Sequence, residues 1–336
     1  MSASLIVYVI MKKPQACPFI LIVGPTGVGK SSFATQLAER LDGEIINADM
    51  GQLYEPLTVG TAKPSWKSEK VPHHGFDILH KPCDYNVIQY RSFAEKCIKE
   101  ITSRNKVPLI VGGSCFYWNG LFFPPQDFND YQKLQGEHLT APFDYTGSEE
   151  VSWELLNTID SERAQEIHCN DVYRITRAIN LWRSSGRKPS LLKPQYHPLR
   201  QNFLIIAVSR PKPELNERID MRVDEMLSLG WVNETQSLDA SWKEFLLRKK
   251  IIGYDDIIMQ EIDAHSITRS CVDRIKQRTR QYARRQNIYW KSWKKKFELK
   301  ANGHQRYCEL SLTLSSFDLY LKQLNPIFKD LGVALL

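Results

Sequence analysis

One segment of the chain has the residue types and spacing that bind phosphate groups. It reads Gly24-Pro-Thr-Gly-Val-Gly-Lys30-Ser31 and fits the pattern G-x-x-x-x-G-K-[ST] between a predicted strand and a predicted helix. In such a loop, backbone N–H groups hold phosphate oxygens, the lysine neutralises their charge and the hydroxyl reaches Mg²⁺. We therefore predict a phosphate-binding loop in which Ser31 is the Mg²⁺ ligand. Its residues are Gly24, Thr26, Gly27, Val28, Gly29, Lys30 and Ser31.

A carboxylate that could act beside this loop is Asp49, which follows the apolar segment 45–48. At the carboxyl edge of a parallel sheet it could hold Mg²⁺ or take a proton from an acceptor, although an ordinary turn aspartate gives the same pattern. Phosphate-loop proteins that use ATP usually place a further acid after a later strand. Here the apolar segment 106–111 is followed by Gly112-Gly113-Ser114, without an acid. The loop therefore does not by itself predict ATP chemistry.

A basic segment in the C-terminal third could contact nucleic acid. Residues 271–296 hold ten Lys or Arg residues and one acid, Asp273, with tyrosine and tryptophan interleaved. Cations contact phosphates and aromatic rings stack on exposed bases, whereas a solvated helix face usually mixes both signs of charge. The segment therefore favours a nucleic-acid partner.

Hydrophobic patterning indicates the elements that must position these groups. Continuous apolar runs predict buried strands at 18–23, 44–48, 106–111 and 203–208. Amphipathic segments predict helices at 31–41, 86–104, 150–168, 171–183, 214–229, 271–296 and near 312–330. Alternation of strands and helices is typical of an α/β fold, and we predict a P-loop NTPase-like, doubly wound parallel sheet.

Composition excludes several classes of protein. With 42% hydrophobic and 25% charged residues, the 336-residue chain is an ordinary globular protein and not a disordered one. Its seven cysteines include no C-x-x-C pair, which argues against a disulfide framework or a zinc site and favours a reducing compartment. The apolar run at 5–11 is too short to cross a bilayer and no later run is long enough, so we expect a cytoplasmic protein without a membrane partner.

Several motifs in order resemble the tRNA dimethylallyltransferase (tRNA isopentenyltransferase) family. Besides the loop 24–31, Asp49-Met-Gly-Gln52-Leu-Tyr54 is similar to the family's Asp-Ser-x-Gln-x-Tyr, and Val111-Gly-Gly-Ser114-Cys-Phe-Tyr117 to its V-G-G-T-x-x-Y. Further matching segments are 60–64, 72–74, 170–178, 218–226, 252–254 and 279–286. The resemblance covers about 18–292 of the chain.

The resemblance implies transfer of a dimethylallyl group from dimethylallyl diphosphate to N6 of the adenosine 3′ of the tRNA anticodon, with release of diphosphate. It implies Mg²⁺ as cofactor, Asp49 as the general base, Arg218 as a group that stabilises the diphosphate, and Ser114 as a residue that positions the reacting centre. The tRNA contacts that it implies are Asp49, Gln52, Ser114, Arg174, Arg177, Arg280, Arg284 and Arg285.

The same resemblance implies a division of the chain. A P-loop core would comprise 17–120 and 169–300, and a small helical insertion at 121–168 would grip the anticodon stem-loop. We expect residues 1–16 to be a disordered leader, 301–336 to be a C-terminal tail, and the protein to be a monomer.

Three other functions fit parts of the sequence. A nucleotide kinase would explain the phosphate loop but not the basic segment. An RNA-binding NTPase without transfer chemistry would explain both. An adenylate isopentenyltransferase would prenylate a free nucleotide, although the insertion and the basic segment favour tRNA.

Overall fold

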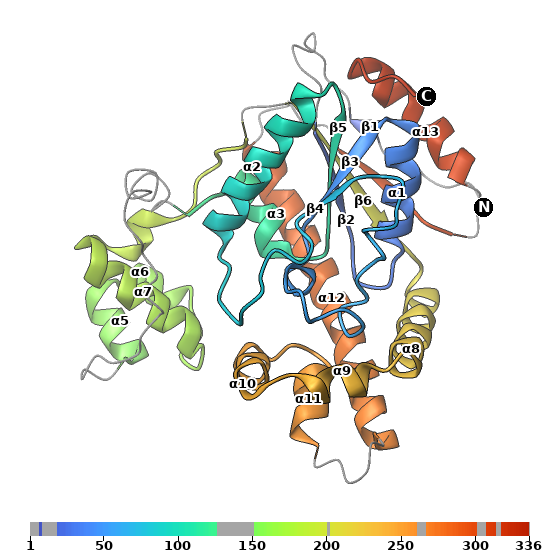
Figure 1. Cartoon of the computed structure of the whole chain (residues 1–336). Coiled ribbons are helices and arrows are strands. Elements are labelled where there is room, and N and C mark those ends of the chain that lie inside the picture. The colour runs from blue at the N-terminus through green and yellow to red at the C-terminus, as the bar shows by residue number, and fades with distance from the viewer. Residues whose placement is uncertain are drawn as a thin grey trace. The chain divides into compact units, whose positions relative to one another are not determined.

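The computed structural model describes residues 7–8, 19–125, 151–199, 202–260, 267–300, 307–313 and 317–335. The chain forms two compact units, one made of 1–121 with 198–336 and the other of 122–197 (Figure 1). The second unit therefore extends beyond the insertion predicted at 121–168. Across the described residues, no helix is both long enough and apolar enough to cross a membrane.

A seven-stranded sheet is the centre of the first unit. Its strands, in spatial order, are β1 (Val7–Tyr8), β7 (Tyr307–Ser311), β6 (Phe203–Ser209), β2 (Phe19–Val23), β5 (Val107–Val111), β3 (Gly43–Asn47) and β4 (His73–His74). All neighbours pair in parallel except β1, which pairs antiparallel to β7. The predicted parallel α/β sheet is confirmed. Because β2, β3 and β5 are neighbours, their carboxyl ends lie side by side.

Helices cover both faces of this sheet, which explains why the central strands are apolar without alternation. On one face, Ile20 and Ile22 of β2 share a core with α1 (Lys30–Arg40) and α13 (Phe317–Asp330). On the other, Phe203 packs against Phe297 of α12 (Arg269–Lys300) with ring centroids 6.0 Å apart. The helices α2 (Val87–Ser103) and α3 (Cys115–Phe122) complete that second layer, and Figure 1 shows α1 and α2 on opposite sides of the sheet.

The remaining helices of the first unit follow β6. They are α8 (Lys212–Ser228), α9 (Trp231–Ser237), α10 (Ala240–Lys249) and α11 (Tyr254–Met259). The last three surround a second core that contains Trp231, Phe245 and Tyr254. A short 3-10 helix, η1 (Gly51–Leu53), follows β3.

Two terminal segments differ from expectation. Strand β1 lies within 1–16, which we predicted as a disordered leader; the other residues of that segment lie outside the described ranges. The predicted tail 301–336 is part of the core, because β7 extends the sheet beside β6 and α13 packs against α1. Leu324 and Phe328 of α13 are fully buried, so this end of the chain stabilises the phosphate-loop layer.

The second unit is a small helical domain made of α5 (Trp153–Ile159), α6 (Ser161–Gln165), α7 (Val172–Ser185) and η2 (Pro189–Leu192). The single helix predicted at 150–168 is broken at Asp160. Its carboxylate accepts hydrogen bonds from the N–H groups of Arg163 (3.1 Å) and Ser190 (2.6 Å), which caps α6 and ties it to η2. Residues 126–150 of the predicted insertion lie outside the described ranges.

Candidate active site

The phosphate loop lies between β2 and α1, as predicted. Gly27 and Gly29 have φ angles of 77° and 102°, which favour glycine because a Cβ atom is strained there. Lys30 Nζ donates to the carbonyl oxygens of Gly24 (2.9 Å) and Pro25 (2.8 Å), so the lysine closes the loop on itself. Ser31 is exposed in the first turn of α1.

Asp49 and Ser114 meet where β3 and β5 end. The Asp49 carboxylate accepts from the N–H of Gly51 (3.1 Å), and Ser114 Oγ accepts from the N–H of Met50 (2.9 Å). The N–H of Ser114 also donates to the carbonyl oxygen of Ala48 (3.2 Å). Gly112 packs against Ala48 so closely that a Cβ there would lie 2.1 Å from the Ala48 carbonyl carbon, which explains the glycine after β5.

Lys30 and Asp49 act on each other electrostatically. Burial lowers the pKa of Lys30 to about 8, and the negative charge of Asp49 opposes that shift. Burial raises the pKa of Asp49, and the charge of Lys30 opposes the rise. A cation that could hold phosphate and a carboxylate that could take a proton therefore lie within one partly desolvated site.

Two arginines in this region were not singled out from the sequence. The charge of Arg222 on α8 acts on both Lys30 and Asp49, and burial lowers the pKa of its guanidinium. Arg210, after β6, donates to the carbonyl oxygen of Val28 (2.8 Å). The predicted Arg218 is exposed and donates to the carbonyl oxygen of Gly27 (3.1 Å). The i, i+4 spacing of Arg218 and Arg222 on one helix was the signal that could have identified Arg222.

Helix α12 joins the site through a buried glutamine. Gln286 Oε1 accepts from the N–H of Thr26 in the phosphate loop (2.8 Å), and Gln286 Nε2 donates to the carbonyl oxygen of Gly113 (2.8 Å). A Cβ atom on Gly113 would lie 2.6 Å from that Nε2 and 3.6 Å from Lys30 Nζ. One side chain of the basic helix therefore holds the phosphate loop and the end of β5 together. It also uses one of the loop N–H groups that we predicted for phosphate.

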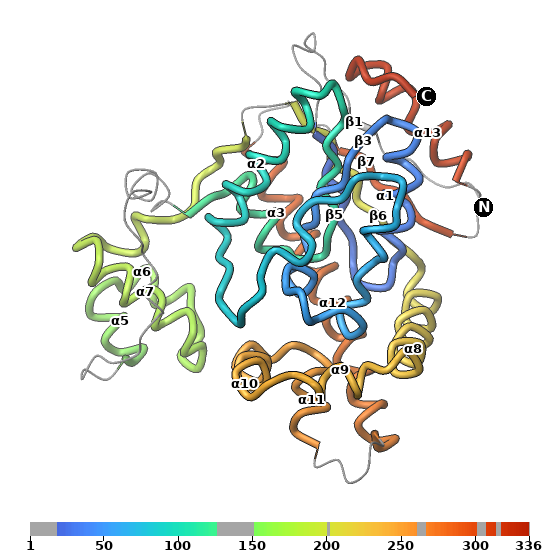
Figure 2. The backbone as a smooth tube through the Cα atoms, viewed as in Figure 1, coloured from blue at the N-terminus to red at the C-terminus, as the bar shows by residue number. Residues whose placement is uncertain are grey.

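The predicted RNA residue Gln52 lies in the loop between β3 and β4, which Figure 2 shows passing α12 toward α9. Gln52 is 8% exposed, and its Nε2 donates to the carbonyl oxygens of Thr61 (3.1 Å) and Ala62 (3.4 Å). Its Oε1 accepts no hydrogen bond from the described residues. This oxygen is therefore the atom of the side chain that could accept a hydrogen bond from RNA.

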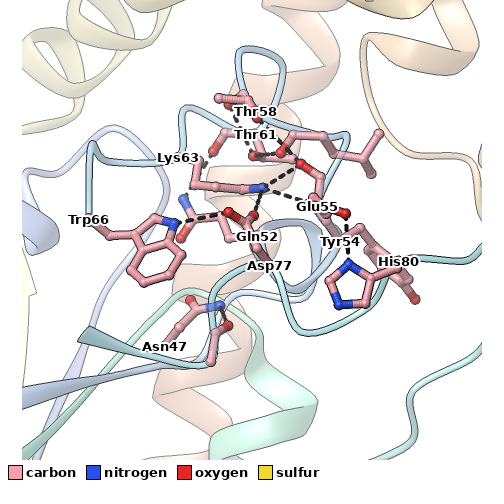
Figure 3. Close-up of polar contacts among 12 residues, drawn as sticks. Asn47, Gln52, Tyr54, Glu55, Thr58, Thr61, Lys63, Trp66, Asp77 and His80 are labelled. Atoms are coloured by element: carbon pink, nitrogen blue, oxygen red, sulfur yellow. Dashed lines mark hydrogen bonds and ion pairs between the residues drawn. The ribbon is translucent and has the colours of Figure 1, made fainter. Parts of the chain in front are cut away.

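Buried polar contacts stabilise that loop (Figure 3). Lys63, whose side chain is 2% exposed, donates to the carbonyl oxygen of Tyr54 (2.8 Å) and forms an ion pair with Asp77. Asp77 also accepts from Trp66 Nε1 (3.1 Å). From outside the loop, the Glu234 carboxylate accepts from the N–H groups of residues 58, 59 and 60. The loop after Asp49 is therefore held by contacts along its length, to Asp77 and to Glu234 of α9.

The cations of α12 divide into two groups, which corrects the prediction of a segment opposed by one acid. Arg274, Lys276, Arg278 and Arg280 form ion pairs with Asp256, Asp224, Asp255 and Asp220, respectively. Those acids lie on α8 and α11, so the sequence of the segment could not reveal them. Arg284 and Arg285 are exposed, and neither forms an ion pair with an acid of the described residues. The guanidinium of Arg285 lies 5.9 Å from the Tyr282 ring centroid.

Arg174 and Arg177 lie on α7 of the second unit. Both are exposed, and Arg174 forms an ion pair with Asp171 (3.3 Å), the residue that caps α7. Beside them, Tyr173 is 71% exposed. This end of α7 therefore presents cations and an aromatic ring to solvent.

Taken together, the fold and the site define an α/β enzyme with a glycine-rich loop of the phosphate-binding pattern, in which a carboxylate acts electrostatically on the loop lysine. The family model for IPP transferase matches residues 52–293. A tRNA dimethylallyltransferase of Alkaliphilus metalliredigens is 34% identical over 281 residues, which are 80% of this chain and 86% of the relative. One of Finegoldia magna is 35% identical over 282 residues, 82% of this chain and 88% of the relative.

Solved structures agree with this assignment. A tRNA isopentenylpyrophosphate transferase from Staphylococcus epidermidis is 27% identical, with a TM-score of 0.58 over 93% of this chain and 99% of that one. A eukaryotic dimethylallyltransferase acting on tRNA is 25% identical, with a TM-score of 0.72 over 95% of this chain and 81% of that one. The chain belongs to the IPP transferase (tRNA dimethylallyltransferase) family, and its activity is tRNA dimethylallyl transfer.

Proposed function

We propose that the chain transfers the dimethylallyl group of dimethylallyl diphosphate to N6 of the adenosine 3′ of the tRNA anticodon. The bond between C1 of the dimethylallyl group and the diphosphate oxygen breaks, the bond between C1 and N6 forms, and the N6 proton goes to Asp49. The observation that carries this proposal is the proximity of Lys30 and Asp49, each of which perturbs the pKa of the other.

The diphosphate would be held by the loop 24–31 with help from the neighbouring arginines. Its negative charge grows as the C–O bond breaks, so fixed cations and N–H groups stabilise the transition state more than the ground state. Arg222 is the arginine whose charge acts on Lys30, and Arg218 lies at the outer edge of the loop. We therefore assign Arg222 to the diphosphate as well as Arg218.

Mg²⁺ would be held by Ser31 together with diphosphate oxygens. In the described residues no group of three or more His, Cys, Asp or Glu side chains could hold a metal ion. That fits Mg²⁺, which is often bound through few protein ligands and substrate phosphates, and the exposed Ser31 hydroxyl is suitably placed beside Lys30. When bound, Mg²⁺ would neutralise charge on the leaving diphosphate.

The RNA would contact the exposed cations of both units. These are Arg284 and Arg285 on α12, and Arg174 and Arg177 on α7. Arg280, which forms an ion pair with Asp220, would have to exchange that partner for a phosphate, as Arg174 would exchange Asp171. Ser114 would hold the Asp49 backbone in place through the N–H of Met50, and Gln52 Oε1 would be an acceptor for RNA. A composition without a disulfide pattern supports a cytoplasmic location, and we propose that the protein acts as a monomer.

The experiment is incubation of the protein with tRNA, Mg²⁺ and labelled dimethylallyl diphosphate, followed by nucleoside analysis. We expect N6-dimethylallyladenosine in tRNA and competition by pyrophosphate. Parallel reactions with free AMP as acceptor, and with ATP in place of the prenyl donor, test the alternatives. Label in AMP but not in tRNA would instead indicate an adenylate isopentenyltransferase. ADP release stimulated by tRNA, without a prenylated nucleoside, would indicate an NTPase.

A further inference from the structure

The C-terminal half of α12 presents cations without acidic partners among the described residues, and one of its tyrosines contacts an exposed aromatic ring. Arg284, Arg285, Lys291 and Lys295 are exposed, and in the described ranges none of them forms an ion pair. At 3.6 residues per turn, Arg284, Lys291 and Lys295 lie along one face of the helix with Ile288, which is 56% exposed. Arg285 lies one turn before Tyr289 and shares the face of that ring. This surface differs from the first half of the helix, where acids neutralise the cations.

The exposed ring is Phe116, in the first turn of α3 and two residues after Ser114. Its side chain is 72% exposed, whereas Tyr117 and Trp118, which follow it, are 4% and 2% exposed. The Phe116 ring contacts the ring of Tyr289 on α12 with centroids 6.0 Å apart and planes at 61°. That contact restricts the ring while most of it stays in solvent.

We propose that Phe116 and Arg285 form a stacking surface for an unpaired nucleobase, with Arg284, Lys291 and Lys295 on the adjoining face of α12 available to the flanking phosphates. The base belongs to the anticodon loop beside the target adenosine, so the inference rests on the proposed function. Ser114 and Asp49 receive the target adenosine, and Phe116 follows Ser114 on the same turn of chain. A neighbouring nucleotide therefore reaches Phe116 when the target base is extruded.

Charge complementarity selects RNA as the occupant. A base stacks on an aromatic ring through its π face, and the flanking phosphates need cations close by. A second copy of this chain carries a net charge of +7 and would place like charges against each other. An uncharged apolar partner would leave the four cations without counter-charges.

The test uses an anticodon stem-loop RNA in which 2-aminopurine replaces, one at a time, the nucleotides flanking the target adenosine. Stacking quenches 2-aminopurine fluorescence, so the readout does not require prenyl transfer. We expect quenching at one flanking position with the parent protein and with Phe116→Tyr, and its loss with Phe116→Ala. Stem-loop affinity should fall of order tenfold in Phe116→Ala, with an unchanged salt slope because no cation is removed.

Met259→Ala is the matched control, because Met259 is 73% exposed on α11 and lies outside the surface. It should bind like the parent. Equal affinity and equal quenching for Phe116→Ala and the parent would overturn the inference. Loss of dimerisation in Phe116→Ala, measured by sedimentation, would assign the ring to a second copy instead. If the parent binds and quenches the RNA but transfers no prenyl group, the proposed function fails and the stacking surface stands.

Discussion

Replacement of Gln286 by methionine tests whether the basic helix holds the diphosphate site in shape. The substitution keeps the length of the side chain and removes both hydrogen bonds, to the N–H of Thr26 and to the carbonyl oxygen of Gly113. Gln286 is 5% exposed, so water replaces these partners poorly. Each buried polar group left unsatisfied costs about 1–3 kcal/mol of stability.

The effect on substrate binding follows from the phosphate loop. Without Gln286 the Thr26 peptide is released in the free enzyme and must be ordered when diphosphate binds. Fixing the backbone of one residue costs about 1–2 kcal/mol, so kcat/KM for dimethylallyl diphosphate should fall by about 5- to 30-fold. The Kd for tRNA measured without dimethylallyl diphosphate should change little, because the exposed cations of α12 are unaltered.

Steady-state kinetics with each substrate varied in turn, together with tRNA binding and thermal unfolding, make the measurement. Gln281→Met is the control, since Gln281 lies on the same helix but is exposed. A lower Tm for Gln286→Met with unchanged kinetics for dimethylallyl diphosphate would refute the reasoning. In that case the glutamine would stabilise the fold without positioning the loop.

Three further predictions concern single steps of the proposed function. Asp49→Asn should bind tRNA normally and lose about 10²–10⁴-fold in turnover, and near-normal turnover would remove Asp49 as the base. Because the pKa of Lys30 is lowered to about 8 and only the protonated amine attracts diphosphate, kcat/KM for dimethylallyl diphosphate should fall as pH rises above about 8. Lys30→Arg stays protonated and should lack that alkaline limb; persistence of the limb would assign it to another group. Substitution of Arg284 and Arg285 by alanine should flatten the slope of log affinity for tRNA against log salt by about one to two. The control substitution of Lys96 and Lys99 on α2 should leave the slope unchanged. A slope for the arginine variant equal to that of the parent would contradict the RNA contact.

The parts of the fold that the sequence predicted are those specified by local pattern. The strands β2, β3, β5 and β6 are continuous apolar runs because helices cover both faces of the sheet. The phosphate loop was predictable because glycines with positive φ and a lysine are required at fixed spacing. Strand β7 and the helices α9 to α11 were missed, because each is short and its burial depends on partners far away in the chain.

The candidate site was predictable to the extent that its residues end strands. Asp49 and Ser114 meet because β3 and β5 are neighbours, which the βαβ order of a doubly wound sheet favours. Gln286 was not predictable as a ligand of Thr26, since 260 residues separate them and only the packing of α12 brings them together. The same holds for the pairing of Arg280 with Asp220 on α8.

Helix α12 would therefore connect the two proposed substrate sites of the enzyme. Its inward side chain Gln286 holds the loop that would take the diphosphate, and its outward side chains Arg284 and Arg285 would take RNA phosphates. These three residues are adjacent in sequence, so a movement of the helix on RNA binding would also displace Gln286 and its hydrogen bond to the N–H of Thr26. Such a connection makes the Gln286→Met variant informative in a second way. If bound tRNA improves the affinity of the parent for dimethylallyl diphosphate, linkage requires that bound dimethylallyl diphosphate improves the affinity for tRNA by the same factor. Both factors should be smaller in the Gln286→Met variant.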